Sequence, residues 1–227
     1  MSKFPIAAFT LLALSLTASA GNISISFQGN LRTDATFTNC GAGCTLGPSN
    51  TDGDYAQWAA VVEAFNVAAP STMSAVTYSY GGGTNAQNAA IAQGGFEPYL
   101  TLFDSSGNFL ASTFSGTYCP AGANVYQGLC VDVLLDGGLL PAGTYQIALS
   151  AWENMSFAEN NGPPALLSDG FTGLGNLAAG EDMHFAFDVF LSNNAPSVPE
   201  PATLGLIGIG LALAGLIHRR RSVWHRQ

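Results

Sequence analysis

The chain has 227 residues, of which 48% are hydrophobic and only 9% are charged. Five of the six basic residues lie near the two ends, so residues 21–199 carry one arginine, Arg32, against fourteen carboxylates, a net charge of −13. Such an acidic segment is poorly suited to bind phosphate groups, which excludes nucleic acid as a partner. Its length, about 180 residues, suits one domain with its own core.

Residues 1–20 have the features of a secretory signal peptide. Lys3 supplies the positive charge, residues 6–16 are largely apolar, and Ala18 and Ala20 form the small-x-small cleavage pattern. The apolar run is too short for a lasting membrane anchor. We therefore expect export by the Sec machinery and cleavage after Ala20.

Between residues 21 and 191 the pattern is mostly that of β-structure. Strand-length runs rich in Val, Tyr, Phe and Thr are expected at 23–27, 58–67, 73–80, 99–103, 131–135, 145–152 and 183–191. Turn residues separate them, for example at 104–108 and 141–143. Short strands with turn signals predict an all-β fold, an antiparallel β-sandwich or jelly roll.

Two segments of this pattern are compatible with a helix, and one strand alternates cleanly. Residues 85–93 suit either a helix or a loop with a single turn, and the Ala-rich stretch 58–65 suits a helix as well as a strand. In residues 183–191 the apolar side chains alternate cleanly, which places His184 and Asp188 on the opposite face.

Four cysteines in an exported chain predict disulfides. Three pairings are open, and we favour the two local ones, Cys40–Cys44 and Cys119–Cys130. Zinc is disfavoured because the cysteines lack the usual CxxC spacing and His184 is the one histidine of the exported segment.

No catalytic motif stands out. The chain lacks a GxSxG elbow, a P-loop and an HExxH helix, and we interpret His184 as a surface histidine. The sequence therefore predicts a protein that is not an enzyme.

No cofactor is expected, and calcium is the open alternative. Asp52 and Asp54 lie in an oxygen-rich loop that loosely resembles an EF-type loop, and Glu63 falls at its twelfth position. The positions between do not fit, so an ordinary polar turn competes with this interpretation. Other carboxylates that would complete a site from neighbouring strands are Asp104, Asp132 and Asp136.

Polysaccharide binding would use exposed aromatic side chains. By residue type the choices are Tyr55, Trp58, Tyr78, Tyr80, Tyr126 and Trp152. Packing in the core explains most of them equally well.

The C-terminal segment predicts a membrane-anchoring device after a linker at 192–198. Residues 202–217 are sixteen uncharged residues, about 24 Å as a helix, against a hydrocarbon core of about 30 Å. Arg219, Arg220 and Arg221 follow, which places residues 222–227 in the cytoplasm and the folded domain outside. The expectation is a marginal transmembrane helix.

Residues 199–221 resemble the tripartite PEP-CTERM sorting signal of Gram-negative bacteria: the motif Pro199-Glu200-Pro201, a short Gly-rich apolar helix and an arginine cluster. The resemblance implies that an exosortase recognises the motif and removes the helix, and that the product is released or attached at the cell surface. Such proteins accompany exopolysaccharide, biofilm and floc formation. An ordinary tail anchor is the alternative.

Residues 82–112 and 140–154 resemble a group of PEP-CTERM proteins and, more distantly, the pre-peptidase C-terminal β-sandwich domains. The resemblance implies that Leu100 and Leu102 face the core, Gly107 forms a turn and Tyr145 packs. Glu97 stands where that pattern usually has Asp. The resemblance implies an accessory role and brings no catalytic residues.

Together these features predict an exported, exosortase-processed, non-enzymatic protein of the cell surface or extracellular matrix, with a structural or adhesive role. A calcium- or polysaccharide-binding module of that matrix is the alternative, and a matrix hydrolase ranks third.

Overall fold

The computed structural model describes residues 22–38, 58–114, 119 and 121–193. Residues 21–194 form one compact unit, and the two terminal segments are grouped separately from it. Within the described ranges the strands are β1 (Ile23–Asn30), β2 (Ala60–Val67), β3 (Ser71–Thr77), β4 (Gly83–Thr84), β5 (Ala90–Ile91), β6 (Pro98–Asp104), β7 (Phe109–Thr113), β8 (Leu134–Leu140), β9 (Gly143–Ala151) and β10 (His184–Ser192). The helical turns are α1 (Leu31–Asp34), α2 (Phe157–Asn161) and η1 (Leu167–Asp169).

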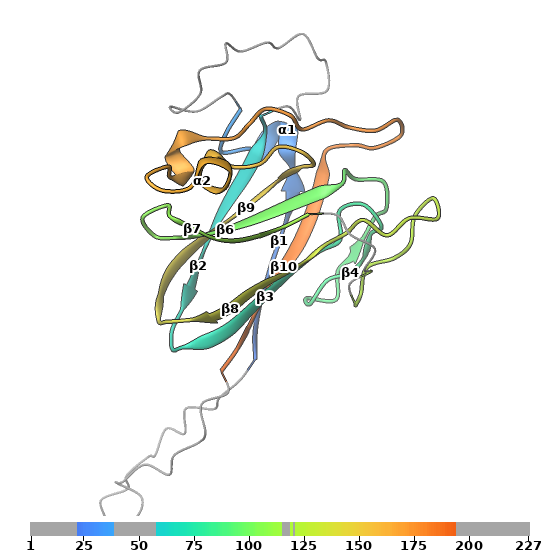
Figure 1. The fold of residues 1–227 in the computed structure, drawn as a ribbon. Helices are drawn as coiled ribbons and strands as arrows, with labels where there is room; N and C mark the ends of the chain where they lie inside the picture. Colours follow the sequence, from blue (N-terminus) through green and yellow to red (C-terminus); the bar gives the residue numbers. More distant parts are fainter. Residues whose placement is uncertain (1–21, 39–57, 115–118, 120, 194–227) are drawn as a thin grey trace, which may run out of the picture. The chain divides into compact units, whose positions relative to one another are not determined.

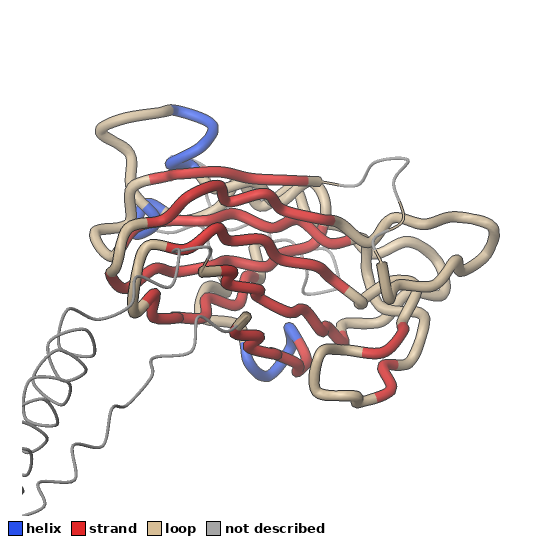
Figure 2. Tube along the Cα trace, turned by 90° about the horizontal axis from the view of Figure 1, so that it is seen from below, coloured by secondary structure: helices blue, strands red, loops and turns tan. Residues whose placement is uncertain are grey.

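The strands form two four-stranded antiparallel sheets, in the orders β1-β10-β3-β8 and β2-β9-β6-β7. Strands β4 and β5 make a separate two-stranded pair, which lies to one side of the larger sheets (Figures 1 and 2). Consecutive strands β2 and β3 belong to different sheets, as do β8 and β9, so the chain crosses between the layers at these turns. The predicted all-β, antiparallel class is confirmed.

One hydrophobic core joins the two sheets. Met73 and Val189 from one sheet belong to the same buried cluster as Leu102 and Leu149 from the other. Full burial of each such side chain stabilises the fold by roughly 1.5–3 kcal/mol. The alternation in β10 works as predicted, because its core-facing side chains and Met183 just before it are all buried: Met183, Phe185, Phe187, Val189 and Leu191.

Two helical alternatives are wrong. Residues 60–67 form the strand β2, so the Ala-rich stretch is not a helix. Residues 85–89 form a turn between the short strands β4 and β5, because the Asn85 side chain accepts hydrogen bonds from the backbone N–H groups of Gln87 (3.1 Å) and Ala89 (2.8 Å). Such local side-chain bonds compete with helix formation.

The strand expected at 131–135 lies further along the chain, at 134–140. Residues before it are tied by side chains instead: Thr77 Oγ1 donates to Asp132 and accepts from the Val133 N–H. The strand then continues through two glycines, where the pairing with β3 shifts register between Met73 and Ser74. A bulge of this kind makes a glycine pair compatible with a strand.

The predicted turn at 104–108 is confirmed. The Asp104 carboxylate accepts from the N–H groups of Ser106 and Asn108, and Gly107 adopts φ +84°. A positive φ at that position favours glycine. Among the flanking core residues, Leu100 and Leu102 are fully buried, and Tyr145 is buried and stacks on Phe65.

The register of β10 defines two ends of the domain. Ile23 pairs with Leu191 and Ser192 pairs with Thr72, so the described chain enters and leaves at the same end, here called the tether end. Asn30 pairs with His184 at the far end. Nine extended residues span about 30 Å between the two ends. Figure 1 shows α1 and α2 toward the far end.

Candidate functional site

The residues predicted to form the sorting device lie outside the described residues. These are the cleavage residues Ala18 and Ala20, the motif Pro199-Glu200-Pro201, the apolar segment 202–217 and the arginines 219–221. In the ranges that the structure describes, no helix is long and apolar enough to cross a membrane. The described domain does show where both segments join it, at the tether end.

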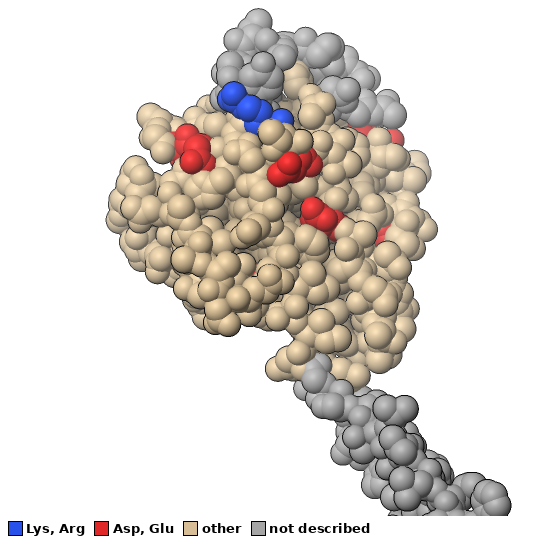
Figure 3. All heavy atoms as spheres, turned by 180° about the vertical axis from the view of Figure 1, so that it is seen from behind, with Lys and Arg blue, Asp and Glu red and all other residues tan. Residues whose placement is uncertain are grey.

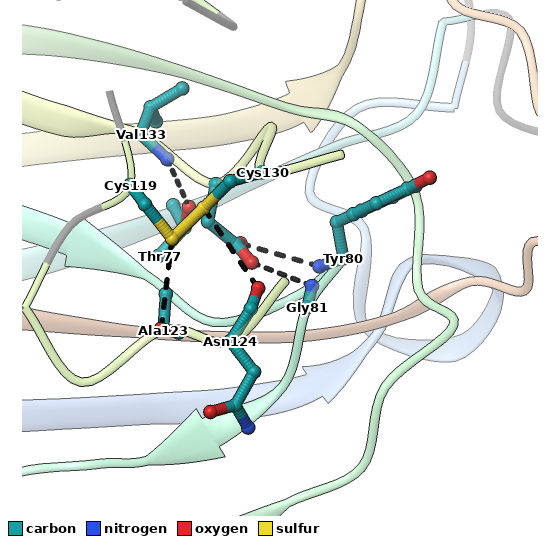
Figure 4. The surroundings of a disulfide bond; sticks show 9 residues. Thr77, Tyr80, Gly81, Cys119, Ala123, Asn124, Cys130 and Val133 are labelled. Atoms are coloured by element: carbon teal, nitrogen blue, oxygen red, sulfur yellow. Dashed lines mark hydrogen bonds between the residues drawn. A yellow bond between two sulfur atoms is a disulfide. The ribbon is translucent and has the colours of Figure 1, made fainter. Parts of the chain in front are cut away.

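The disulfide Cys119–Cys130 is present, with 5.2 Å between the Cα atoms, and this pairing is confirmed. It closes a loop beside the segment that follows β3 (Figure 4). Cys40 and Cys44 lie outside the described residues, so their pairing stays a prediction. Cross-linking this loop limits the freedom of the unfolded chain, as is typical of exported domains.

Asp132, two residues after the disulfide, is a buried structural carboxylate. Its oxygens accept hydrogen bonds from Thr77 Oγ1 (2.9 Å) and from the backbone N–H groups of Tyr80 (3.3 Å) and Gly81 (2.7 Å), as Figure 4 shows for the donor groups. Burial raises its pKa although these bonds oppose the shift. Asp132 therefore fixes the chain after β3 to the chain before β8.

The other carboxylates considered for calcium are likewise engaged locally. Asp104 holds its own turn, and Asp136 accepts from the Gly138 N–H (2.9 Å). Across the described ranges, no group of three or more His, Cys, Asp or Glu side chains is placed to hold a metal ion. Asp52 and Asp54 lie outside those ranges.

His184 and Asp188, predicted on the outer face of β10, have different surroundings. His184 is half-buried, with Nδ1 against the Asp182 carboxylate and Nε2 3.1 Å from the Ala92 carbonyl oxygen. Asp188 is fully buried, because the β4–β5 segment covers it, and it accepts from Ser26 Oγ and the Ala86 N–H (2.7 Å). The outer face of β10 is therefore partly covered.

Most of the aromatic side chains named for polysaccharide binding are packed inside the domain, and one lines a cleft. Trp58, Tyr78 and Tyr80 are buried, which confirms the packing explanation for them. Tyr126 packs edge-on against Tyr80, and Tyr55 lies outside the described residues. Trp152 differs, because it lines a cleft.

This cleft lies at the far end, where β6 begins and β9 ends, and has a volume of about 400 Å³. We call it the far-end cleft. It is lined by Glu97, Trp152, Glu153, Leu174, Asn176, Ala178 and Glu181. The volume falls in the range of small-molecule sites. Of these residues, the sequence indicated only Trp152 as a candidate binding residue, and Glu97 was named only as a departure from a structural pattern.

Pairing of the strands and one loop bring these residues together. Pro98 pairs with Ala151, so Glu97 and Trp152 meet at the strand ends, and the Trp152 N–H donates to the Glu97 carbonyl (2.9 Å). The following loop is held against them because the Asn176 N–H donates to the Trp152 carbonyl (3.2 Å). The far-end cleft is thus formed by backbone contacts between distant segments.

Buried residues support that loop from below. The Gly173 N–H donates to Asn154 Oδ1 (2.9 Å), and Asn154 is fully buried. Gly173 has φ +76°, and a side chain there would overlap the indole of Trp58. Trp58 therefore acts as a platform under the loop that forms one wall of the far-end cleft.

The electrostatics of the far-end cleft are those of an acidic site. Burial raises the pKa of Glu181, and the nearby charge of Glu97 raises it further, although the Ala178 N–H donates to Glu181 Oε2 (2.8 Å). Burial also raises the pKa of Tyr80, and Glu181 and Glu97 add to this shift. In Figure 3 the acidic side chains of the visible face lie toward the end that carries its blue, basic side chain.

Trp152 continues into an exposed aromatic ledge. Its ring stacks on Phe114 with centroids 4.7 Å apart, and Phe114 is 54% exposed. Tyr99 stacks behind the pair, 5.9 Å from Trp152. Its hydroxyl donates to Glu159 Oε2 (2.5 Å), which also anchors the ledge to α2. The aromatic ledge consists of Trp152 and Phe114 on this support.

Comparison with known families gives one finding: residues 197–222 match the family described as the PEP-CTERM protein-sorting motif. The chain thus carries this sorting motif where its sequence predicted one. The motif implies export, membrane-associated processing with an exosortase as the processing partner, and then a place at the surface. No curated protein and no solved structure is significantly similar to this chain.

Proposed function

We propose that this protein is a non-enzymatic component of the cell surface or of its exopolysaccharide matrix, with a structural or adhesive role. The observation that carries the proposal is the sorting motif at residues 197–222, which begins five residues after β10 ends at Ser192. Exosortase processing would then leave the sandwich domain attached or released through its tether end.

The construction of the domain supports this role. Both connections leave at the tether end, whereas the cleft lies at the far end of the domain. The disulfide Cys119–Cys130 suits an oxidising exterior. The acidity of the exported segment keeps it soluble.

A variant of the motif tests the proposal. In a host that makes an exosortase, wild-type protein is expected in the surface or extracellular fraction. Replacement of Pro199, Glu200 and Pro201 by alanine is expected to leave the chain at full length in the membrane fraction. Pro196→Ala, in the linker outside the motif, is the matched control and is expected to behave as wild type. Equal processing and release of the triple variant would refute the proposal.

Polysaccharide binding is the second candidate function, because partly buried Trp152 and exposed Phe114 form an aromatic ledge beside a cleft. The calcium version rests on Asp52 and Asp54. A rise in thermal stability with millimolar calcium, absent with magnesium, would support it, and no shift would count against it. Hydrolysis ranks last, and its test is loss of activity on one carboxylate-to-amide change.

A further inference from the structure

The far-end cleft combines three features that point to one class of ligand. Among the described residues, its lining has three carboxylates, from Glu97, Glu153 and Glu181, and no basic side chain; Arg32 lines the adjoining pocket, which shares Glu181. Trp152 also lines it, and the ring of Trp152 stacks on Phe114 to form the aromatic ledge. It also presents the amide side chain of Asn176. We propose that this cleft binds amine-bearing, positively charged sugar units of an extracellular glycan.

The negative charge of the far-end cleft favours a cationic ligand. Glu181 is half-buried, close enough to Glu97 for their charges to repel, and the raised pKa of Glu181 reflects both effects. An ammonium group between the two carboxylates would remove this repulsion and replace lost hydration. An anionic sugar would instead add a further negative charge to the site. The far-end cleft is therefore complementary to a cation.

The aromatic ledge favours a cation that is carried by a sugar ring over a bare metal ion. A metal ion would need several oxygen ligands converging on one point, and the described residues hold no such group. An indole face offers apolar contact to the C–H face of a sugar and attracts a nearby ammonium. The carboxylates and Asn176 can bind the ring hydroxyls. The exposed ring of Phe114 would seat the next unit of a chain.

The place of the far-end cleft fits a polymer outside the cell. It lies about 30 Å along β10 from Ser192, where the chain leaves toward the sorting motif. A polymer outside the cell as the ligand rests on the proposed function, since it requires that the protein is displayed by its tether end. The chemistry of the site itself does not depend on that assumption.

The experiment measures binding of defined oligosaccharides to the exported chain by calorimetry at pH 6 and low salt. The probes are a tetramer of β-1,4-linked glucosamine and its fully N-acetylated counterpart, which has the same sugar backbone but carries a neutral acetamide in place of each ammonium group. We expect the amine form to bind at least tenfold more tightly. Equal affinity for the two tetramers would overturn the proposal, because the carboxylates would then contribute no preference for the ammonium groups.

Variants assign the binding to this site. Trp152→Ala and Glu181→Gln are each expected to weaken binding at least tenfold, and Glu181→Gln is expected to reduce its salt dependence. Asp136→Asn, an exposed carboxylate on β8, is the matched control and is expected to bind as wild type. Equal weakening by Asp136→Asn would refute a specific site. If Trp152→Ala fails to fold, Glu181→Gln carries the test, since it keeps the shape of the side chain.

Tetralysine tests the other occupant, a basic protein segment. We expect it to compete weakly, since it lacks a ring to lie on Trp152. Competition as strong as that of the glucosamine tetramer would overturn the assignment to a glycan. These measurements use purified protein, so their failure would leave the sorting experiment above unaffected, and failure of the sorting experiment would leave the binding result standing.

Discussion

Replacement of Asp132 by alanine is the sharpest test of how the domain is held together. Its carboxylate is 1% exposed and accepts three hydrogen bonds, from the Thr77 hydroxyl and the backbone N–H groups of Tyr80 and Gly81. The alanine variant removes the two oxygens that accept all three hydrogen bonds. The chain after β3 would then lose its connection to the segment that leads into β8.

The expected loss in the free energy of unfolding follows from the three donors that would be left without an acceptor. A buried donor without a partner costs about 1–3 kcal/mol. Removing the carboxylate also removes the cost of burying it, the same cost that raises its pKa. We therefore expect a net loss of about 3 kcal/mol in the free energy of unfolding, which lowers Tm by about 6–12 °C for a domain of this size.

Urea unfolding followed by tryptophan fluorescence measures this loss. Asp136→Ala is the control: Asp136 is an exposed carboxylate that accepts a single bond from Gly138. We expect that variant to lie within about 0.5 kcal/mol of wild type. The reasoning is refuted if the two alanine variants unfold at the same urea concentration.

Three further predictions concern stability. Replacing both Cys119 and Cys130 by serine is expected to lower the free energy of unfolding by about 3 kcal/mol, because the disulfide closes a loop with a sequence separation of 11; an unchanged urea midpoint would contradict this. Gly107→Ala should lower Tm more than Gly138→Ala does. Both glycines have a positive φ, but only a Cβ at position 107 would press on η1, 3.2 Å from the backbone nitrogen of Leu167. An equal fall in Tm for the two variants would count against the packing at this turn. Burial raises the pKa of Asp132 in the folded state above its unfolded value near 3.8. The free energy of unfolding of wild type should therefore fall relative to that of Asp132→Asn as pH rises from about 3.8 through the raised pKa. A difference between the two proteins that stays constant from about pH 3 to 7 would disprove this.

Periodicity predicted the sheets well where one face of a strand meets the core. The alternation in β10 correctly placed Phe187 and Val189 inside, because a period of two sends successive side chains to opposite faces. It also placed Asp188 on the other face but said nothing of what covers that face. The β4–β5 segment lies there, and its Ala86 N–H binds Asp188. Contacts of this kind join residues a hundred positions apart, so local patterns do not reveal them.

The start of β8 was misplaced for a related reason. Val131 to Leu135 read as a strand by composition, yet Asp132 and Val133 bind Thr77 through its side chain. A hydrophobic run also gives no sign that a bulge will accommodate two glycines, and the actual strand continues through them. Propensity alone favours strand residues, and tertiary contacts decide which of them pair.

The sequence pointed to the sorting motif directly, because that motif is contiguous. It pointed to the far-end cleft only through Trp152. Glu97, Glu153 and Glu181 come from three separate segments that meet through the pairing of β6 with β9 and the loop before β10. The one available signal was that Glu97 precedes a buried strand and Glu153 follows its partner strand, since strand ends of an antiparallel pair meet at one edge.

The central claim is that the chain is exported and cut at its sorting motif. The most direct test is the intact mass of the protein recovered from the medium or matrix outside the cells of its native host. The account predicts a chain that begins at Gly21 and ends between Pro199 and Thr203. A chain that runs on to Gln227 would contradict it, because the apolar segment would then remain as a lasting anchor.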